Sequence, residues 1–538
     1  MKADRIIAGG RLINGSGNPW RSQDVLLAGD KIADVVPPGS VSLDGVERLD
    51  ATGRFVCPGF IDIQSHSISS LMRDGRSVSK LTQGVTTEIM GEIWTPSPIG
   101  GQFQDSFSGP VAGEADDVWR ERARDWKAFG DWLRTMETTG VSPNVGSFLS
   151  GSTLRQYAKG MSMTPASDAE LNVMRKVMAE AMEDGAFGIS YALIYPPDTY
   201  ASTREIIEIA KVVAQHEGIY ITHMRSESAK ILDGLEEAIS VGRAAGLPVE
   251  IYHLKASGKS AWGLMPEVIR RIETSRRSGQ DVTANMYPYE ATGTGFATCL
   301  PAWLAEDGNF FAKLQDSSVR RRIRNELEDP ASSYDGQLRS ALPPNIMPVG
   351  FRLPENQQYV GMRLDEISRR RNTDSVDTIC DLLAAEQRQV PTIFFKMSPE
   401  NTALQLSQPW VSISSDGPGV APEWALADGP THPRAYGTYP RVFRKYVREE
   451  GHLTWEEAVR KMTSAVADRL GLRNRGRIEP GYYADLVVFD PETIADRATF
   501  AAPHQLSVGV REVFVNGIEV VKNGTHTGKT PGRFVRPG

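Results

Sequence analysis

The first residues with a chemical pattern lie in the run Val56-Cys57-Pro58-Gly59-Phe60-Ile61-Asp62-Ile63-Gln64-Ser65-His66. An apolar stretch ends there in two polar side chains that are two residues apart. Because side chains alternate between the faces of a strand, Gln64 and His66 would point the same way from the strand end. Two converging donors at a strand end would form half of a metal site.

Three of the eight histidines fall at the ends of predicted strands, namely His66, His223 and His253. Neutral imidazole is a common ligand of zinc. A single histidine at the end of a buried strand is more often structural than a ligand. Three of them at the ends of different strands of one sheet favour a shared metal site instead.

An aspartate ends a further apolar run, Val411–Ser414, at Asp416. A carboxylate at the end of a buried strand would be an unpaired charge without a metal ion or another cation nearby. Taken alone, Asp416 is equally well explained as a turn residue before Gly417-Pro418. The three histidines favour a role in catalysis.

These residues need strands that end at one edge, and the middle of the chain alternates strand-like and helix-like segments. Helical periodicity is found at Ala169–Asp184, Arg204–His216 and Ser226–Ala245. The apolar runs are Phe60–Ile63, Val85–Met90, Val145–Leu149, Phe187–Ser190, Ile219–Thr222, Glu250–Leu254, Val282–Met286 and Val411–Ser414. Eight runs with polar ends predict an α/β fold with a (β/α)8 TIM-like barrel, rather than an open doubly wound sheet.

Both ends of the chain are rich in short strands and turns, and Asn516-Gly517 is a strong hairpin signal. We expect residues 1–57 and 471–538 to form one small β-sandwich that flanks a barrel at 58–470. The interval from about 291 to 409 is too long for one loop, and it predicts an insertion with extra helices over the active-site face.

The bulk composition is that of an ordinary globular protein, with 538 residues, 40% of them hydrophobic, and a net charge of −7. No basic patch suggests nucleic acid, and no apolar stretch suggests a membrane. The N-terminus lacks the apolar core of a signal peptide, and the three cysteines are far apart. We expect a cytoplasmic protein with a small-molecule substrate, and a homo-oligomer is compatible with the sequence.

The first-strand run resembles the Gly-Phe-Ile-Asp-x-His-x-His signature of the amidohydrolase superfamily, with Gln64 in place of the first histidine. Nearly the whole chain resembles the N-acyl-D-amino-acid deacylases (D-aminoacylases), through the order and spacing of several motifs. The motifs are Gln83–Thr87, Gly188–Ser190, Ile194–Pro197, Thr222–Glu227, His253–Lys255, Ser415–Gly417, His432–Arg434, Gly437-Thr438, Pro440-Arg441, Glu479–Gly481 and Ala484–Val487.

This resemblance implies roles for the strand-end residues. His223 and His253 would be metal ligands. Asp416 would hold and deprotonate the attacking water and then pass the proton to the leaving amine. The reaction implied is zinc-dependent hydrolysis of the amide bond of N-acyl-D-amino acids or similar compounds, which releases a carboxylate and the free amino acid.

The resemblance also places Lys255, Arg225, Arg434 and either Tyr191 or Tyr195 near the substrate. Lys255 would polarise the scissile carbonyl. Alternatively, Lys255 would be carbamylated and bridge two metal ions, but the carbamylated lysine of related amidohydrolases lies at the end of an earlier strand. A tyrosine would help to stabilise the oxyanion. Arg434 suits a substrate carboxylate because guanidinium forms a bidentate fork, although a loop arginine paired with a surface carboxylate is the plainer explanation.

Two departures from the deacylase pattern concern the metal. The cysteine expected after the second strand is missing from Met90–Trp94, and Glu92 lies one position before its place. A carboxylate can replace the thiolate, so we expect Glu92, His223 and His253 to bind one zinc ion tightly. A second site at Gln64, His66 and Asp416 should be weak or absent, because an amide oxygen is a weaker donor than imidazole. Gln64 and His66 would then serve either as hydrogen-bonding groups or as a marginal second site.

Two rival functions stay open at this point. The same scaffold could hydrolyse cyclic amides or dipeptides, because fold alone does not choose the reaction. The loss of the first histidine and of the cysteine would also suit a metal-poor, non-catalytic assembly protein. Against that, the remaining site groups have no evident scaffold role. The aromatic residues Phe296, Trp303, Phe310 and Phe311 of the insertion would line an acyl pocket or form the core of the insertion itself.

Overall fold

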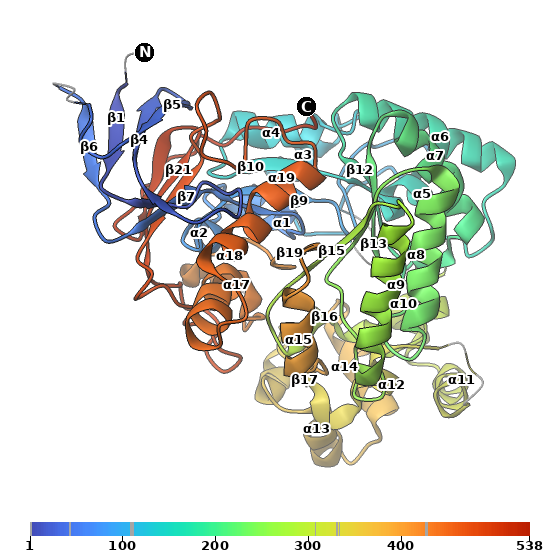
Figure 1. Ribbon diagram of the computed structural model, residues 1–538. Coiled ribbons are helices and arrows are strands. Elements are labelled where there is room, and N and C mark those ends of the chain that lie inside the picture. The colour runs from blue at the N-terminus through green and yellow to red at the C-terminus, as the bar shows by residue number, and fades with distance from the viewer. Residues whose placement is uncertain are drawn as a thin grey trace.

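The computed structural model describes residues 3–41, 45–107, 112–306, 308–329, 332, 334–425 and 429–538. Figure 1 shows three regions: strands from both chain ends at one side, alternating strands and helices in the middle, and a lobe of helices below. The fold is therefore α/β, as predicted. No helix in the described ranges combines the length and apolarity needed to span a membrane.

Strands from the two chain ends lie side by side in Figure 1. One sheet has the order β5-β4-β1-β6, and the other has the order β23-β22-β21-β20-β7-β2-β3. Their strands are β1 (Arg5–Ala8), β2 (Arg11–Leu12), β3 (Arg21–Ser22), β4 (Asp24–Ala28), β5 (Lys31–Val36), β6 (Glu47–Asp50), β7 (Phe55–Pro58), β20 (Leu486–Phe489), β21 (Val510–Val515), β22 (Ile518–Lys522) and β23 (Thr525–His526). Ile7 and Val25 share one buried cluster with Leu486 and Phe514, so the two ends of the chain are packed together.

Parallel strands carry the middle of the chain. They form a three-stranded sheet, β10-β9-β8, and a six-stranded sheet, β11-β12-β13-β14-β15-β19. The strands are β8 (Phe60–Asp62), β9 (Val85–Met90), β10 (Asn144–Ser147), β11 (Leu149–Ser150), β12 (Gly188–Ala192), β13 (Ile219–His223), β14 (Val249–Ile251), β15 (Val282–Met286) and β19 (Val411–Ile413). Only Phe148 separates β10 from β11, and beyond β8 and β19 a parallel bridge joins Ser65 to Gly417.

Most of these strands are followed by helices that pack on the sheet. α6 begins with a capping box between Ser167 and Glu170, which satisfies free backbone donors of its first turn. The helices around the parallel strands are α1 (Ile68–Arg73), α2 (Val78–Leu81), α3 (Asp117–Ala123), α4 (Asp131–Thr139), α5 (Gly151–Lys159), α6 (Asp168–Glu183), α7 (Thr203–Gln215), α8 (Ile231–Ala245), α9 (Met265–Arg277), α15 (Pro399–Leu406), α17 (Arg434–Arg441), α18 (Trp455–Met462) and α19 (Ser464–Arg469).

Two predicted boundaries are wrong in a way that matters for the site. The run Glu250–Leu254 was expected to be a strand, but β14 ends at Ile251, so His253 lies in the following loop. The helix expected from Ser226 begins only at Ile231. Residues 226–230 lie outside the helix, and in this loop the hydroxyls of Ser226 and Ser228 donate to Asp335 of the insertion.

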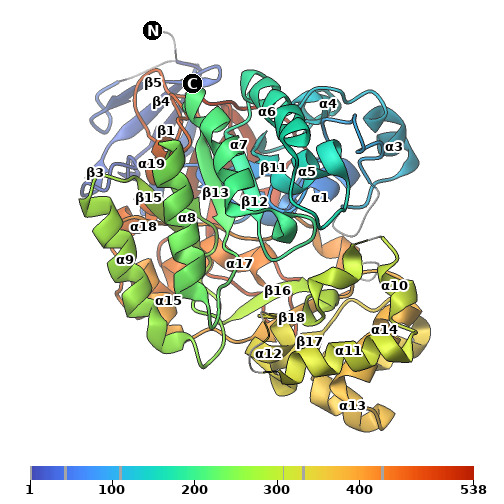
Figure 2. The same cartoon turned by 90° about the vertical axis from the view of Figure 1, so that its right-hand side faces the viewer.

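The segment between β15 and β19 folds as the lobe at the bottom of Figures 1 and 2. Its sheet is antiparallel, with the order β16-β18-β17. The elements are β16 (Ala291–Gly295), α10 (Phe310–Lys313), α11 (Ser317–Glu328), α12 (Gln337–Ala341), β17 (Ile346–Pro348), α13 (Leu364–Arg371), α14 (Ser375–Glu386) and β18 (Pro391–Phe395). Phe296, Ile323, Ile379 and Phe394 belong to a separate buried cluster, so the insertion has its own core.

Candidate metal centre and substrate cavity

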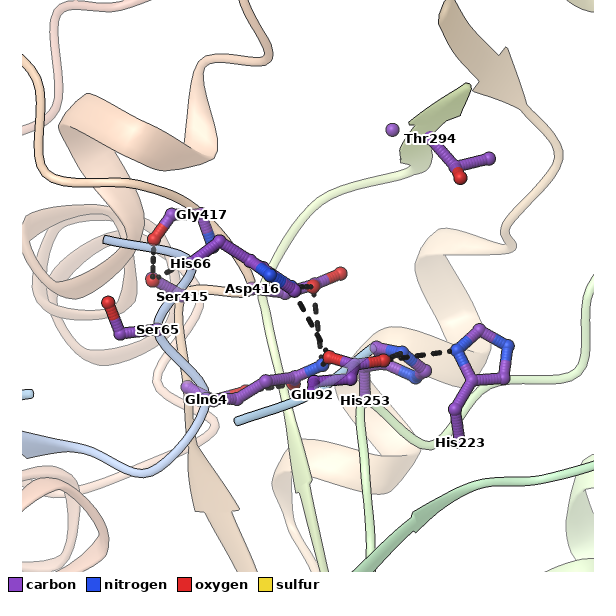
Figure 3. Close-up of polar contacts among 12 residues, drawn as sticks. Gln64, Ser65, His66, Glu92, His223, His253, Thr294, Ser415, Asp416 and Gly417 are labelled. Atoms are coloured by element: carbon purple, nitrogen blue, oxygen red, sulfur yellow. Dashed lines mark hydrogen bonds and ion pairs between the residues drawn. The ribbon is translucent and has the colours of Figure 1, made fainter. Parts of the chain in front are cut away.

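Polar side chains meet where the parallel strands end. Glu92 follows β9, His223 is the last residue of β13, and His253 lies two residues past β14. Gln64, His66 and Asp416 approach from the ends of β8 and β19. Figure 3 shows Glu92 between the pair of histidines on one side and His66 with Asp416 on the other. Parallel strands bring their carboxyl ends to one edge, which explains the convergence.

The first candidate ligand group is Glu92, His223 and His253, and all three side chains are buried. Glu92 Oε1 lies 3.2 Å from His223 Nδ1 and 3.2 Å from His253 Nε2. Ligands of a tetrahedral zinc ion, at about 2.0–2.2 Å from the metal, lie about 3.3–3.6 Å from one another. The spacing and donor types of this group therefore fit a zinc ion.

A second group consists of His66, Glu92 and Asp416. His66 Nε2 lies 2.9 Å from Asp416 Oδ1 and 3.3 Å from Glu92 Oε2. Each oxygen of the Glu92 carboxylate thus faces a different group. The predicted second site consisted of Gln64, His66 and Asp416, whereas the observed group contains Glu92 in place of Gln64.

Gln64 presents its amide nitrogen to the site. Nε2 donates to Glu92 Oε2 and, over 3.2 Å, to Asp416 Oδ1, while Oε1 accepts from Ser414 Oγ at 3.2 Å. An amide N–H donor does not ligate a metal ion, and its hydrogen bonds engage the same carboxylate oxygens that face His66. In this arrangement Gln64 is a hydrogen-bonding neighbour of the carboxylates, which is the alternative to ligation that the sequence left open.

The backbone is strained at the same place. Ile93, His253 and Asp416 have positive φ angles of 69°, 33° and 49°, and all three line one cavity. Non-glycine residues in this region cost free energy and collect at functional sites, where the surrounding structure holds them. At His253, Asn285 Oδ1 accepts from the backbone N–H over 2.9 Å and fixes the loop.

Behind the histidines lies Glu227, a residue that the sequence analysis quoted in a motif but did not assign to the site. Glu227 Oε1 lies 3.0 Å from His253 Nδ1, and Oε2 lies 3.5 Å from His223 Nε2. Lys255 Nζ donates to Glu227 Oε1 over 2.6 Å and lies 2.8 Å from His253 Nδ1. A carboxylate in this position orients the ring of a ligating histidine.

The electrostatics keep the carboxylates ionised. Burial alone would raise the pKa of Asp416, but the charges of Arg434 and His253 and the hydrogen bond from His66 outweigh it and lower that pKa. Burial likewise opposes ionisation of Glu92, yet His253, His223 and His66 hold its pKa well below the usual value. For His66, burial is outweighed by Asp416 and Glu92, which raise its pKa to about 9. A metal ion would compete with protons for these ligands.

The ligand groups open into a cavity of about 280 Å³. Arg434 lies on its wall: Nη1 is 2.7 Å from Asp416 Oδ2, and Nη2 donates to the carbonyl of Gly293 over 3.0 Å. Tyr195 Oη lies 2.6 Å from Thr294 Oγ1 on another part of the wall. The wall also includes polar residues that the sequence did not assign to the site, among them Glu227, Tyr287, Gln337 and Lys396.

Two predicted substrate-binding residues do not line this cavity. Tyr191 is fully buried within β12, where its ring lies against Gly151 of α5 and packs on Tyr220. Arg225 donates to Glu237 and to the carbonyls of Thr199 and Ala201. Arg225 lines a neighbouring cavity of about 690 Å³, together with Trp303, Phe310 and Phe311 of the insertion.

The chain is similar in sequence and structure to known amidohydrolases. The model of the Amidohydrolase family matches residues 407–521. The chain is 34% identical to a D-aminoacylase of Alcaligenes xylosoxydans xylosoxydans over 99% of this chain and 97% of the relative. A structure of D-aminoacylase is similar to this chain with a TM-score of 0.83 and 31% identity, covering 99% of this chain and all of that one. That enzyme is described as having a binuclear metal centre with one-metal activation and second-metal attenuation. An N-acyl-D-glutamate deacylase from Bordetella bronchiseptica, complexed with zinc and a phosphonate mimic of the tetrahedral intermediate, gives a TM-score of 0.81 and 26% identity over the full length of both chains.

Proposed function

The chain belongs to the D-aminoacylases of the amidohydrolase family, and we propose that it hydrolyses the amide bond of N-acyl-D-amino acids with a divalent metal ion. The products are a carboxylate and the free amino acid. The observation that carries the proposal is the convergence of Glu92, His223 and His253 beside a buried, ionised Asp416. The similarity to D-aminoacylase over the whole chain supports the choice of substrate.

Glu92, His223 and His253 would hold one zinc ion tightly. The fit of their spacing to tetrahedral zinc supports this assignment, as does the orientation of His253 by Glu227. When bound, zinc supplies Lewis acidity to the carbonyl and lowers the pKa of a water molecule toward about 7. A second site at His66, Glu92 and Asp416 would be weak, because Gln64 already donates to both carboxylates.

Asp416 is the residue that moves protons. Its Oδ1 would accept a proton from the attacking water and return it to the leaving nitrogen as the amide bond breaks. The lowered pKa of Asp416 keeps the carboxylate ionised and able to act first as a base. Hydrogen bonds from His66 and Gln64 hold the carboxylate in position.

The remaining wall residues would bind and orient the substrate. Arg434 would form a fork with the α-carboxylate, as guanidinium groups do. Lys255 and Tyr195 would donate to the carbonyl oxygen as negative charge develops on it. Both line the cavity that contains the ligands, which supports a role in contact with the substrate.

We also infer that the parallel strands form one closed (β/α)8 barrel over residues 58–470, with an insertion at 291–409, and that residues 1–57 and 471–538 form a β-sandwich. The continuity of β10 with β11 and the bridge between Ser65 and Gly417 at the other junction support closure. The cluster shared by the two terminal sheets supports the sandwich.

A substrate panel tests the proposed reaction. The purified protein is incubated with N-acetyl-D-methionine, a hydantoin and dihydroorotate, and release of the amine or ring-opened product is measured. We expect turnover of the linear amide at a kcat/KM at least about tenfold above that of either cyclic amide. Faster turnover of a ring would instead assign the site to cyclic amides, and no turnover of any substrate with zinc added would contradict the enzymatic function.

A further inference from the structure

A buried lysine of the insertion lies on the wall of the metal-site cavity and has no part in the mechanism above. Lys396 directly follows β18 and is only 5% exposed. Its backbone is fixed, because its carbonyl accepts from Gly258 N over 2.8 Å and from Trp262 Nε1 over 2.9 Å. The ammonium group therefore reaches the cavity from a firmly held position.

Lys396 differs in its partners from Lys255 and Arg434, the other lysine and the arginine of this cavity. Lys255 faces Glu227 at 2.6 Å, and Arg434 faces Asp416 at 2.7 Å. Lys396 Nζ donates to the neutral Oε1 of Gln337, and within the described part of the chain no carboxylate lies within 4.0 Å of it. A buried charge is costly unless it is paired.

The nearby acids are engaged elsewhere. Glu227 is shared by Lys255 and the two ligand histidines. Asp335 accepts hydrogen bonds from Ser226 and Ser228 on separate oxygens. The cavity thus contains a cation whose matching anion is not supplied by the neighbouring side chains.

We propose that Lys396 binds a second carboxylate of the substrate, in addition to the α-carboxylate at Arg434. The preferred substrates are then N-acyl amino acids with two anionic groups. The second carboxylate belongs either to the amino-acid side chain or to the acyl group. This inference rests on the proposed function and narrows its substrate class.

Two matched substrate pairs test the proposal on the zinc-loaded wild-type protein. N-acetyl-D-glutamate is compared with N-acetyl-D-glutamine, and N-succinyl-D-methionine is compared with its terminal amide, N-succinamoyl-D-methionine. Each pair differs by one charge at nearly constant size. We expect kcat/KM of the acid to exceed that of its amide by about tenfold or more in one pair, because hydrogen bonds to a charged group are stronger than neutral ones. The pair that shows the preference identifies the source of the carboxylate.

Variants then assign the preference to Lys396. Lys396→Met should reduce the acid-to-amide ratio by about tenfold, while Lys396→Arg should retain most of it. Lys461→Met is a matched control, because Lys461 is a buried lysine whose Nζ donates to backbone carbonyls outside the cavity. It should leave the ratio unchanged. Thermal unfolding and zinc content of each variant show whether it is folded.

The failures of the two proposals are distinguishable. Turnover of the amides with no preference for either acid in the wild-type protein overturns the role of Lys396 and leaves the proposed function standing. An acid preference that Lys396→Met does not reduce also overturns it. Absence of turnover on N-acetyl-D-methionine and on all four members of the pairs overturns the proposed function, and this inference with it.

Discussion

Glu92 presents one carboxylate oxygen to each of the two candidate ligand groups. Oε1 faces His223 and His253, and Oε2 faces His66 and Gln64. A carboxylate at this position can bind one metal ion through one oxygen while its other oxygen accepts hydrogen bonds from His66 and Gln64. Glu92 is therefore the side chain that the two candidate ligand groups share.

Removal of Glu92 should abolish metal binding and catalysis together. Loss of an outer-shell partner of a metal site costs about 10- to 100-fold in affinity or activity, and a direct ligand should cost more. We therefore expect Glu92→Ala to retain less than about a tenth of the wild-type zinc and to lose activity more than about 100-fold. Elemental analysis and kcat/KM measure this, with the exposed Glu236→Ala as control. Full metal content in Glu92→Ala would refute the ligand assignment.

Glu227 should act through the histidines it orients. Glu227→Gln keeps the size of the side chain but removes the charge that faces His253 Nδ1 and Lys255 Nζ. We expect zinc affinity to fall by about 10- to 100-fold, with activity partly restored at high zinc concentration. Titration of the metal-free variant with zinc measures the effect. Unchanged zinc affinity would show that Glu227 orients neither ligand.

The preference assigned to Lys396 should depend on pH. Burial lowers the pKa of Lys396 to about 8, and the groups that act on it are Glu227, Lys255, Asp335 and Cys299. The ammonium is charged below that pKa and becomes neutral as the pH rises through it. The acid-to-amide ratio of kcat/KM should therefore be constant from about pH 6 to 7 and fall above about pH 8. A ratio that stays constant to about pH 9.5 would contradict this assignment.

Residue types at strand ends were enough to predict most of the cluster. His66, Glu92, His223, His253 and Asp416 meet in the structure because each lies at or just past the end of a parallel strand. Lys396 and Glu227 could not be assigned this way. Lys396 reaches the cavity from the insertion, whose position no local pattern encodes, and Glu227 lies in a loop that the sequence predicted to be helical.

At the scale of elements, the periodicity of the sequence predicted where strands and helices lie better than it predicted the residues at which they begin and end. β9 and β15 match the predicted ranges, whereas the run Val145–Leu149 is divided into β10 and β11. The resemblance left Tyr191 and Tyr195 as alternatives near the substrate, and their positions in the structure differ. Tyr191 lies within β12 and points at α5, while Tyr195 lies past the strand end and reaches the cavity.

The hairpin between β21 and β22 is confirmed, and it joins the two ends of the chain. Asn516 and Gly517 have φ angles of 48° and 76°, as a tight two-residue turn requires. A Cβ at Gly517 would lie 2.0 Å from the carbonyl oxygen of Gly29, in the turn between β4 and β5. This contact places the C-terminal hairpin directly on the N-terminal sheet.

Substitution at this contact should destabilise the protein. Gly517→Ala adds a clash with the Gly29 backbone to the left-handed strain of about 1–2 kcal/mol for an L-residue. Gly524→Ala is the matched control, because Gly524 has a φ of 77° and its Cβ would have only ordinary contact, 3.4 Å from Val510 O. We expect thermal unfolding at a lower temperature for Gly517→Ala than for Gly524→Ala. Equal unfolding temperatures for the two variants would mean that the hairpin is not closely packed against the N-terminal turn.

At the scale of the whole molecule, the α/β class and the pairing of the two chain ends followed from the alternation of the middle segments and the β-rich termini. The internal antiparallel sheet of the insertion did not, because β16, β17 and β18 pair over long sequence separations. That sheet matters for function, since it carries Lys396 and the Thr294 partner of Tyr195 to the cavity.

We expect one firmly bound metal ion at Glu92, His223 and His253 to support hydrolysis of N-acyl-D-amino acids. The most direct test measures bound metal in the purified protein by elemental analysis, together with hydrolysis of N-acetyl-D-methionine and N-acetyl-L-methionine. We expect about one zinc ion per chain and turnover of the D-substrate over the L-substrate. Two firmly bound metal ions would contradict the single-site assignment. No metal, together with no turnover after zinc is added, would contradict the account as a whole.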